Sequence, residues 1–119
     1  MMDEKKLKDN LVSIASELFR FEKVFKKAIG KLEIEDQNKY VSQFAWFEKK
    51  VIKALDESGL HLVNIEGQIY DPGMAVTPLN IEDFETDDVL YVVQMMEPII
   101  MNDDGVVKTG TVILGRIDK

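Results

Sequence analysis

Apolar residues recur at spacings of four and three along the first quarter of the chain. This is the heptad pattern of a helix that packs against other helices. The seam consists of Leu7, Leu11, Ile14, Leu18, Phe21, Phe25, Ala28 and Leu32, and it is widened by Val12, Ala15, Phe19 and Ile29. A stripe this wide favours a helix in a bundle over a two-stranded coil. Gly30 weakens the helix, and the polar segment 33–38 is expected to be a loop.

A second seam predicts a second helix. It contains Tyr40, Phe44, Phe47, Val51 and Ala54, with Val41, Ala45, Ile52 and Leu55 beside it. We expect this helix to begin near Asp36 to Lys39, because Asp36 or Asn38 can serve as its N-cap. Gly59 is placed to end it as a C′ residue with positive φ. Residues 1–59 are therefore predicted to form a helical hairpin.

Two helices alone rarely bury such wide apolar faces. Either the second half of the chain covers the remainder, or a second copy of the chain does. A four-helix bundle formed by two chains is the simpler solution, so we expect a homodimer. The residues expected to carry dimerisation are Leu11, Leu18, Phe25, Phe44, Phe47 and Val51.

Residues 60–119 read as a compact β domain. Short apolar stretches between turn residues predict strands over 60–65, 68–70, 74–79, 88–96, 99–101 and 106–114. Asp71-Pro72-Gly73 is expected to be a turn in which glycine takes the strained position. Pro78 indicates an edge strand, and 102–105 is a second turn. The fold class is thus α+β: a helical hairpin, then a small, mostly antiparallel sheet or partly closed barrel.

Charge divides the chain at the same place. Residues 1–60 carry 12 Lys/Arg and 11 Asp/Glu, a net of +1, whereas residues 61–119 carry 3 and 11, a net of −8. Nucleic acids and anionic lipids are bound chiefly through Lys and Arg, so neither nucleic acid nor a membrane is an expected partner. A protein with a basic face fits the acidic half. The alternative is that the acidic side chains simply keep this half soluble.

The residues of common catalytic and metal sites are missing or scattered. The chain has one histidine, His61, and no cysteine, which excludes a thiolate zinc site and a Cys-His dyad. The acidic segments 82–88 and 102–105 lack the alternating ligands and closing glutamate of an EF-hand. We therefore expect no enzyme activity, no metal and no cofactor, and the acidic segments are expected to be solvated loops. The alternative for them is a weak cation site. The lack of cysteine is compatible with a cytoplasmic protein.

Residues in a fixed order connect the two halves. The order is Ala54-Leu55, Gly59, Gly67, Tyr70-Asp71-Pro72, an acidic loop, Val89–Gln94 and Gly105–Val112. This series resembles the GrpE family, the nucleotide exchange factors of DnaK-type chaperones, and the resemblance covers roughly residues 10–117.

The resemblance implies a stress-response co-chaperone that acts by binding alone. GrpE-like proteins dimerise through a four-helix bundle, and their β domain binds the chaperone's nucleotide-binding domain and promotes ADP release. By matched position, Lys108 is expected to be an electrostatic contact. Tyr70, Pro72 and Met74 are expected to shape the docking surface.

Two departures favour an alternative hypothesis. The long helix that precedes the bundle in the family has no counterpart in this sequence, and Lys108 stands where the family has arginine. Lysine keeps the charge but loses the bidentate fork. The alternative is an interaction or adaptor module that keeps the GrpE-like fold without exchange activity.

Overall fold

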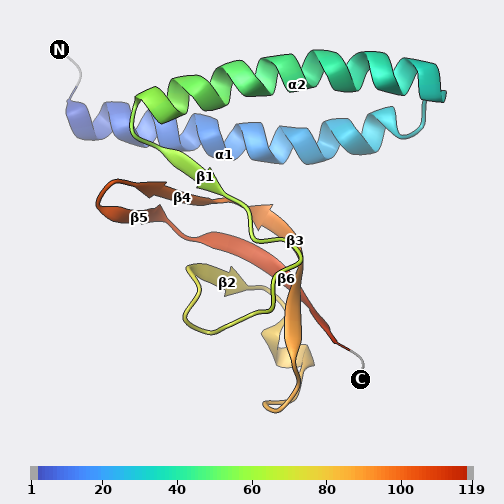
Figure 1. Ribbon diagram of the computed structural model, residues 1–119. Coiled ribbons are helices and arrows are strands. Elements are labelled where there is room, and N and C mark those ends of the chain that lie inside the picture. The colour runs from blue at the N-terminus through green and yellow to red at the C-terminus, as the bar shows by residue number, and fades with distance from the viewer. Residues whose placement is uncertain (1–2, 118–119) are drawn as a thin grey trace. The chain divides into compact units, whose positions relative to one another are not determined.

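The chain folds as two compact units, Met1–His61 and Leu62–Lys119. The structure is a computed structural model that describes residues 3–117. The first unit is helical and the second consists of short strands (Figure 1), so the predicted α+β layout is confirmed. Within the described residues, neither helix has an apolar stretch long enough to cross a bilayer.

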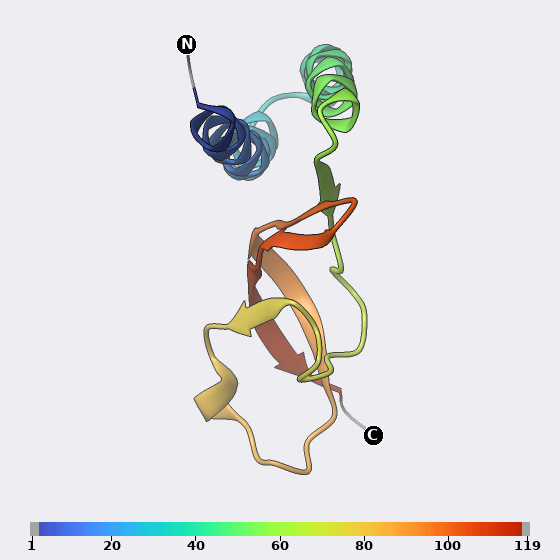
Figure 2. The same ribbon diagram turned by 90° about the vertical axis from the view of Figure 1, so that its left-hand side faces the viewer.

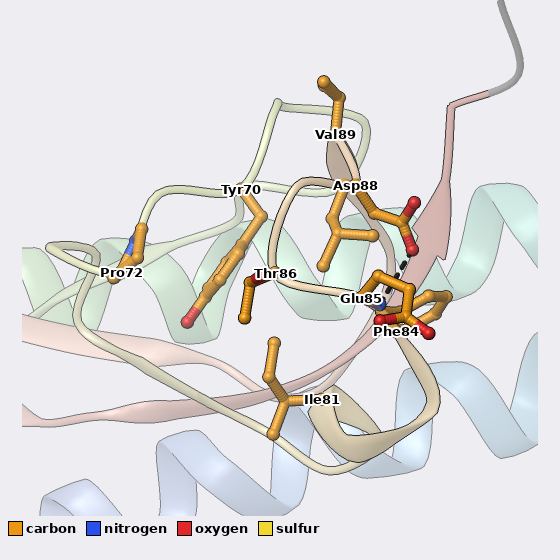
Figure 3. A pocket seen from close by; sticks show the side chains of 9 residues that line it. Tyr70, Pro72, Ile81, Phe84, Glu85, Thr86, Asp88 and Val89 are labelled. Atoms are coloured by element: carbon orange, nitrogen blue, oxygen red, sulfur yellow. Dashed lines mark hydrogen bonds between the residues drawn. The ribbon is translucent and has the colours of Figure 1, made fainter.

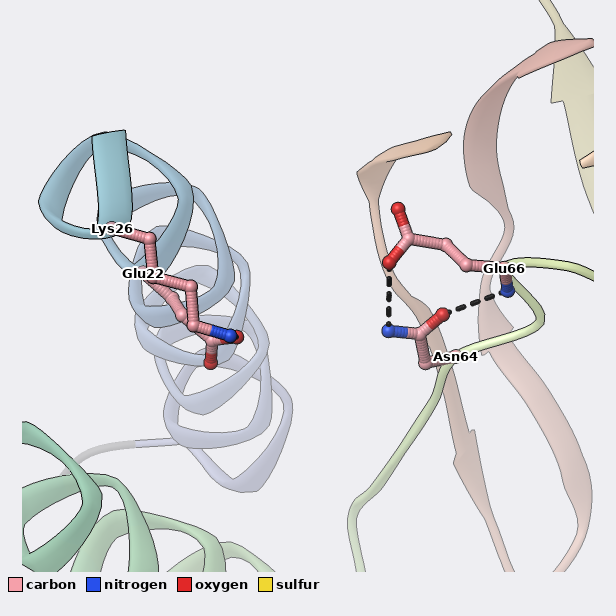
Figure 4. A network of polar contacts seen from close by, with 4 residues as sticks. All are labelled: Glu22, Lys26, Asn64 and Glu66. Atoms are coloured by element: carbon pink, nitrogen blue, oxygen red, sulfur yellow. Dashed lines mark hydrogen bonds and ion pairs between the residues drawn. The ribbon is translucent and has the colours of Figure 1, made fainter. Parts of the chain in front are cut away.

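Helices α1 (Glu4–Ile29) and α2 (Ile34–Glu57) form the hairpin (Figure 1). Asp3 caps α1, because its carboxylate accepts the Lys5 amide at 3.0 Å. On α1, the Lys26 ammonium lies 3.0 Å from the Glu22 carboxylate one turn earlier (Figure 4). This pair adds the small stabilisation typical of an i,i+4 contact.

The predicted loop over 33–38 is wrong, because α2 already begins at Ile34. Its N-cap residue is Glu33, which makes no side-chain cap hydrogen bond. Acidic residues in the first turn complement the positive end of the helix dipole. The Gln37 amide also donates to the Leu32 carbonyl at 2.6 Å and so ties the helix to the preceding turn.

Gly59 ends α2 as predicted, with φ at 83°. Two hydrogen bonds close a Schellman motif: the Leu60 amide donates to the Leu55 carbonyl at 2.9 Å, and the Gly59 amide donates to the Asp56 carbonyl at 3.0 Å. Leu55 and Leu60, the two positions that usually carry apolar residues in this motif, are both buried.

The second unit contains two three-stranded sheets (Figures 1 and 2). One has the order β1 (His61–Val63), β4 (Ile99–Asn102), β5 (Gly105–Lys108), and the other β2 (Val76–Pro78), β6 (Gly110–Arg116), β3 (Leu90–Glu97). β4–β5 and β3–β6 are antiparallel, but β2 runs parallel to β6. As Pro78 indicated, β2 lies at a sheet edge.

The predicted long strand over 106–114 is wrong. It is two strands, β5 and β6, which Thr109 separates and which belong to different sheets. The same change of sheet takes place between β3 and β4, at the buried Pro98. A proline cannot donate to a ladder, so it fits a point where the chain leaves one sheet for the other.

Residues 67–70 run along the outer edge of β3 without forming a regular strand. Backbone hydrogen bonds join the Gly67 amide to the Val92 carbonyl and the Tyr70 amide to the Leu90 carbonyl, each at 2.8 Å. Upstream, the Glu66 carboxylate accepts the Met95 amide at 2.9 Å, where β3 bulges. Asn64 holds Glu66 through two further hydrogen bonds (Figure 4).

The core of the second unit is small and tightly packed. Its completely buried side chains include Val92, Met95, Ile100 and Val112. The Met95 sulfur accepts the Ile65 amide at 3.2 Å. Gly110 has no room for a side chain, because a Cβ there would lie 2.7 Å from the Glu97 carbonyl oxygen. The backbones on either side of the two sheet changes therefore cross in close contact.

We predict that Gly110→Ala lowers the free energy of unfolding by about 1–3 kcal/mol, because the added methyl group must push two backbone segments apart. Gly73→Ala is the matched control. A Cβ at residue 73 meets only the Asp71 side chain, at 3.4 Å, and the change should stay below about 1 kcal/mol. Urea denaturation of the two variants measures the difference. Equal losses would show that the close crossing does not limit stability.

Candidate functional site

The helical hairpin covers one row of its heptad seam in part and leaves the other row open. On α1, Leu7, Ile14 and Phe21 are 51%, 55% and 53% exposed. Leu18, in the alternate row, is buried. The Phe25 ring stacks on that of Phe44, with ring centres 5.0 Å apart. The two rows thus have different roles within the single chain.

The residues predicted to carry dimerisation divide between these two environments. Leu18 is buried; Leu11, Phe25, Phe44 and Val51 are half-buried; Phe47 is exposed. Beside Phe47 lies an apolar groove of about 380 Å³. Its lining residues are Ser13, Ile14, Glu17, Leu18, Phe21, Phe47 and Val51. The seam pattern contained Ile14 and Phe21, but only the structure separates this open row from the row inside the hairpin.

The Asp-Pro turn is built as predicted except at its glycine. The Asp71 carboxylate accepts the Gly73 amide at 2.8 Å, and the Asp71 carbonyl accepts the Met74 amide at 2.9 Å. The expectation that Gly73 takes the strained position is wrong, because its φ is not positive. Pro72 presets the first bend, and the aspartate side chain stabilises the second.

This turn forms one end of a groove of about 440 Å³, which we call the acidic groove. Its lining residues are Tyr70, Pro72, Ile81, Phe84, Glu85, Thr86, Asp88, Val89 and Leu90. Figure 3 shows Tyr70, Thr86 and Ile81 in its middle, with Pro72 towards one side and Glu85 and Asp88 towards the other. Two predicted docking residues, Tyr70 and Pro72, thus meet in one groove, whereas Met74 and Lys108 do not line it.

Ile81 and Phe84 also line the acidic groove, although the sequence pattern did not identify them as site residues. Segment 80–87 reads as a polar acidic loop, but a short 3₁₀ helix, η1 (Ile81–Asp83), carries Ile81 and Phe84 to the groove. The available signal was the spacing of three between these two apolar residues, which fits one turn of a 3₁₀ helix.

Lys108 stands at the end of β5 and is engaged within its own unit. Its ammonium lies 3.2 Å from the Glu97 carboxylate, and the other oxygen of that carboxylate accepts the Thr111 hydroxyl at 3.3 Å. The lysine and glutamate side chains are 37% and 46% exposed. A partner carboxylate that binds Lys108 must therefore compete with Glu97.

No constellation for metal binding appears in the described part of the chain. Among residues 3–117, no three His, Asp or Glu side chains gather closely enough to hold an ion. His61 lies at the end of the first unit, and its ring nitrogen Nδ1 is 2.9 Å from the Asp56 carboxylate. Both side chains are about half exposed.

Comparison with known proteins assigns no family. A scan against protein-family models, a search of curated proteins and a search of solved structures each find no significant match to this chain. The resemblance to the GrpE family therefore stays a prediction from its ordered residues.

We predict that the Glu97–Lys108 pair contributes little to stability. A double-mutant cycle with Glu97→Gln and Lys108→Met should give a coupling energy of about 0.2–1 kcal/mol, as for other partly exposed pairs. Glutamine keeps an acceptor for Thr111, so the cycle isolates the charge contact. Urea denaturation of the four proteins measures it. A coupling of about 3 kcal/mol or more would make the pair a structural element instead.

Proposed function

We propose that this chain is a GrpE-like co-chaperone, a homodimer whose β unit binds the nucleotide-binding domain of a DnaK-type chaperone and promotes ADP release. The observation that supports the proposal is the backbone conformation of three glycines that belong to the residue order shared with the GrpE family. Gly59, Gly67 and Gly105 are the residues with positive φ in the described part of the chain. The first ends α2, the second precedes the segment along β3, and the third turns β4 into β5.

Such a protein needs no catalytic residues. It acts by binding the nucleotide-open conformation of the chaperone more tightly than the closed one, and it shifts the equilibrium by that difference in affinity. Each 1.4 kcal/mol or so of difference changes the ratio of the two conformations about tenfold. A cytoplasmic location is part of the proposal, as is the absence of any cofactor.

A second copy of the chain is the proposed cover for the open row of the hairpin. Leu7, Ile14 and Phe21 recur every seven residues on one helix, so the row continues along one side of α1. In a two-fold symmetric dimer the same row is contributed by both chains, and a self-complementary apolar stripe suits this arrangement. The product is a four-helix bundle.

The adaptor module is the second candidate, and the Glu97–Lys108 pair favours it. Lys108, which stands where the family has arginine, already lies 3.2 Å from the Glu97 carboxylate. The strongly acidic second half of the chain, with 3 Lys/Arg against 11 Asp/Glu, also suits a basic partner. An adaptor of this kind binds its partner without changing the rate of nucleotide release.

We predict that the chain sediments as a dimer at micromolar concentration and that Ile14→Glu makes it a monomer. The substitution places a charge in the open row, where the second chain would leave it desolvated. Val24→Glu is the control, because Val24 is equally exposed on the same helix, at 59%, but does not line the groove. Analytical ultracentrifugation gives the result. A native chain that is monomeric at micromolar concentration would refute the dimer.

We predict that Lys108→Glu slows release of labelled ADP from the DnaK-type chaperone of the same organism by about tenfold, which corresponds to 1.4 kcal/mol of lost contact. The control is the charge swap Glu97→Lys with Lys108→Glu, which restores an ion pair but moves the cation from residue 108 to residue 97. Stopped-flow fluorescence measures the rate. If the swap restores full release, Lys108 is structural. If the native chain binds the chaperone without accelerating release, the adaptor function replaces exchange.

A further inference from the structure

The acidic groove has walls that are fixed by backbone contacts. Tyr70 is held by the hydrogen bond of its amide to the Leu90 carbonyl, and Phe84 by that of its amide to the Ile81 carbonyl at 3.3 Å. Both aromatic side chains are half-buried, whereas Pro72 and Ile81, which also line the groove, are exposed. The groove is thus a formed aromatic and aliphatic channel.

Two carboxylates lie at one end of this channel. The Asp88 carboxylate accepts the Glu85 amide at 2.9 Å, which fixes its position (Figure 3). Neither Asp88 nor Glu85 has an ion-pair partner among residues 3–117. The two cationic side chains described in the second unit, Lys108 and Arg116, do not line the groove.

We infer that the acidic groove binds an arginine side chain of a partner protein. The aliphatic part of arginine suits the apolar rim, since long cationic side chains bury their stems and leave the charged head at a polar end. The planar guanidinium stacks on an aromatic face such as that of Tyr70, and its fork of donors matches a carboxylate such as Asp88. A lysine ammonium carries the same charge, but it cannot stack as a plane on the aromatic ring or donate two parallel hydrogen bonds to one carboxylate.

The charge of the unit selects against the other classes of macromolecule. With a net of −8 over residues 61–119, the second half of the chain repels nucleic-acid and anionic-lipid phosphates. The inference rests on the proposed function where the partner that supplies the arginine is the chaperone. It adds to that function the surface of contact, the acidic groove, and the side chain that the groove recognises. It applies equally to the partner of an adaptor.

The test is titration of the ¹⁵N-labelled full chain with N-acetyl-arginine methylamide, followed by NMR. The expected result is saturable shifts of the amide signals of Tyr70, Glu85, Thr86 and Asp88. The citrulline analogue has nearly the same shape without the charge and should give no saturable shift, and the lysine analogue should bind more weakly. Equal shifts with arginine and citrulline, or none at the highest soluble concentration, overturn the inference.

Two variants locate the binding site. Asp88→Asn keeps an acceptor for the Glu85 amide but removes the charge, so it should weaken arginine binding by about fivefold, the factor that corresponds to 1 kcal/mol. Asp104→Asn makes the same change on the β4–β5 turn, outside the groove, and should leave affinity unchanged. Equal effects of the two variants would indicate non-specific attraction and overturn the inference. The titration contains no chaperone, so it tests the groove independently of nucleotide exchange. If arginine binds but the stopped-flow assay shows no acceleration of ADP release, the exchange function alone is refuted.

Discussion

The close crossing of two backbone segments at Gly110 is the constraint on which the second unit depends. The chain changes sheets twice, between β3 and β4 and between β5 and β6, and Gly110 lies against the Glu97 carbonyl at this place. Only glycine fits at this position, because a Cβ would lie 2.7 Å from the Glu97 carbonyl oxygen. The crossing also brings Glu97 to Lys108 and Thr111, and it leaves the outer edge of β3 open for the segment that leads to the acidic groove.

The helical unit could be predicted well because its signals are local. Heptad spacing and a C′ glycine fixed both helices and the end of α2. The start of α2 was missed, since capping preference favoured Asp36 or Asn38 while the chain begins the helix at Ile34 without a side-chain cap. There the acidic first turn and the Gln37 hydrogen bond outweigh the cap.

The second unit was harder to predict because its pairing is long-range. An apolar run over 106–114 gives no sign that its halves join different sheets, and nothing in the short segment 76–78 reveals its parallel pairing with β6. The acidic groove combines Tyr70 and Pro72, which the sequence singled out, with Ile81 and Phe84, which it placed in a polar loop. Periodicity reports which face of an element is apolar, not which distant element will cover it.

The two neighbouring methionines of β3 have opposite environments, and this makes their thioethers unequal towards oxidants. Met96 is exposed, whereas Met95 is fully buried with its sulfur already accepting the Ile65 amide. Peroxide should therefore convert Met96 to the sulfoxide in the folded protein and reach Met95 only when the core opens. The rate at which Met95 is oxidised therefore measures how often the core of the β unit opens spontaneously.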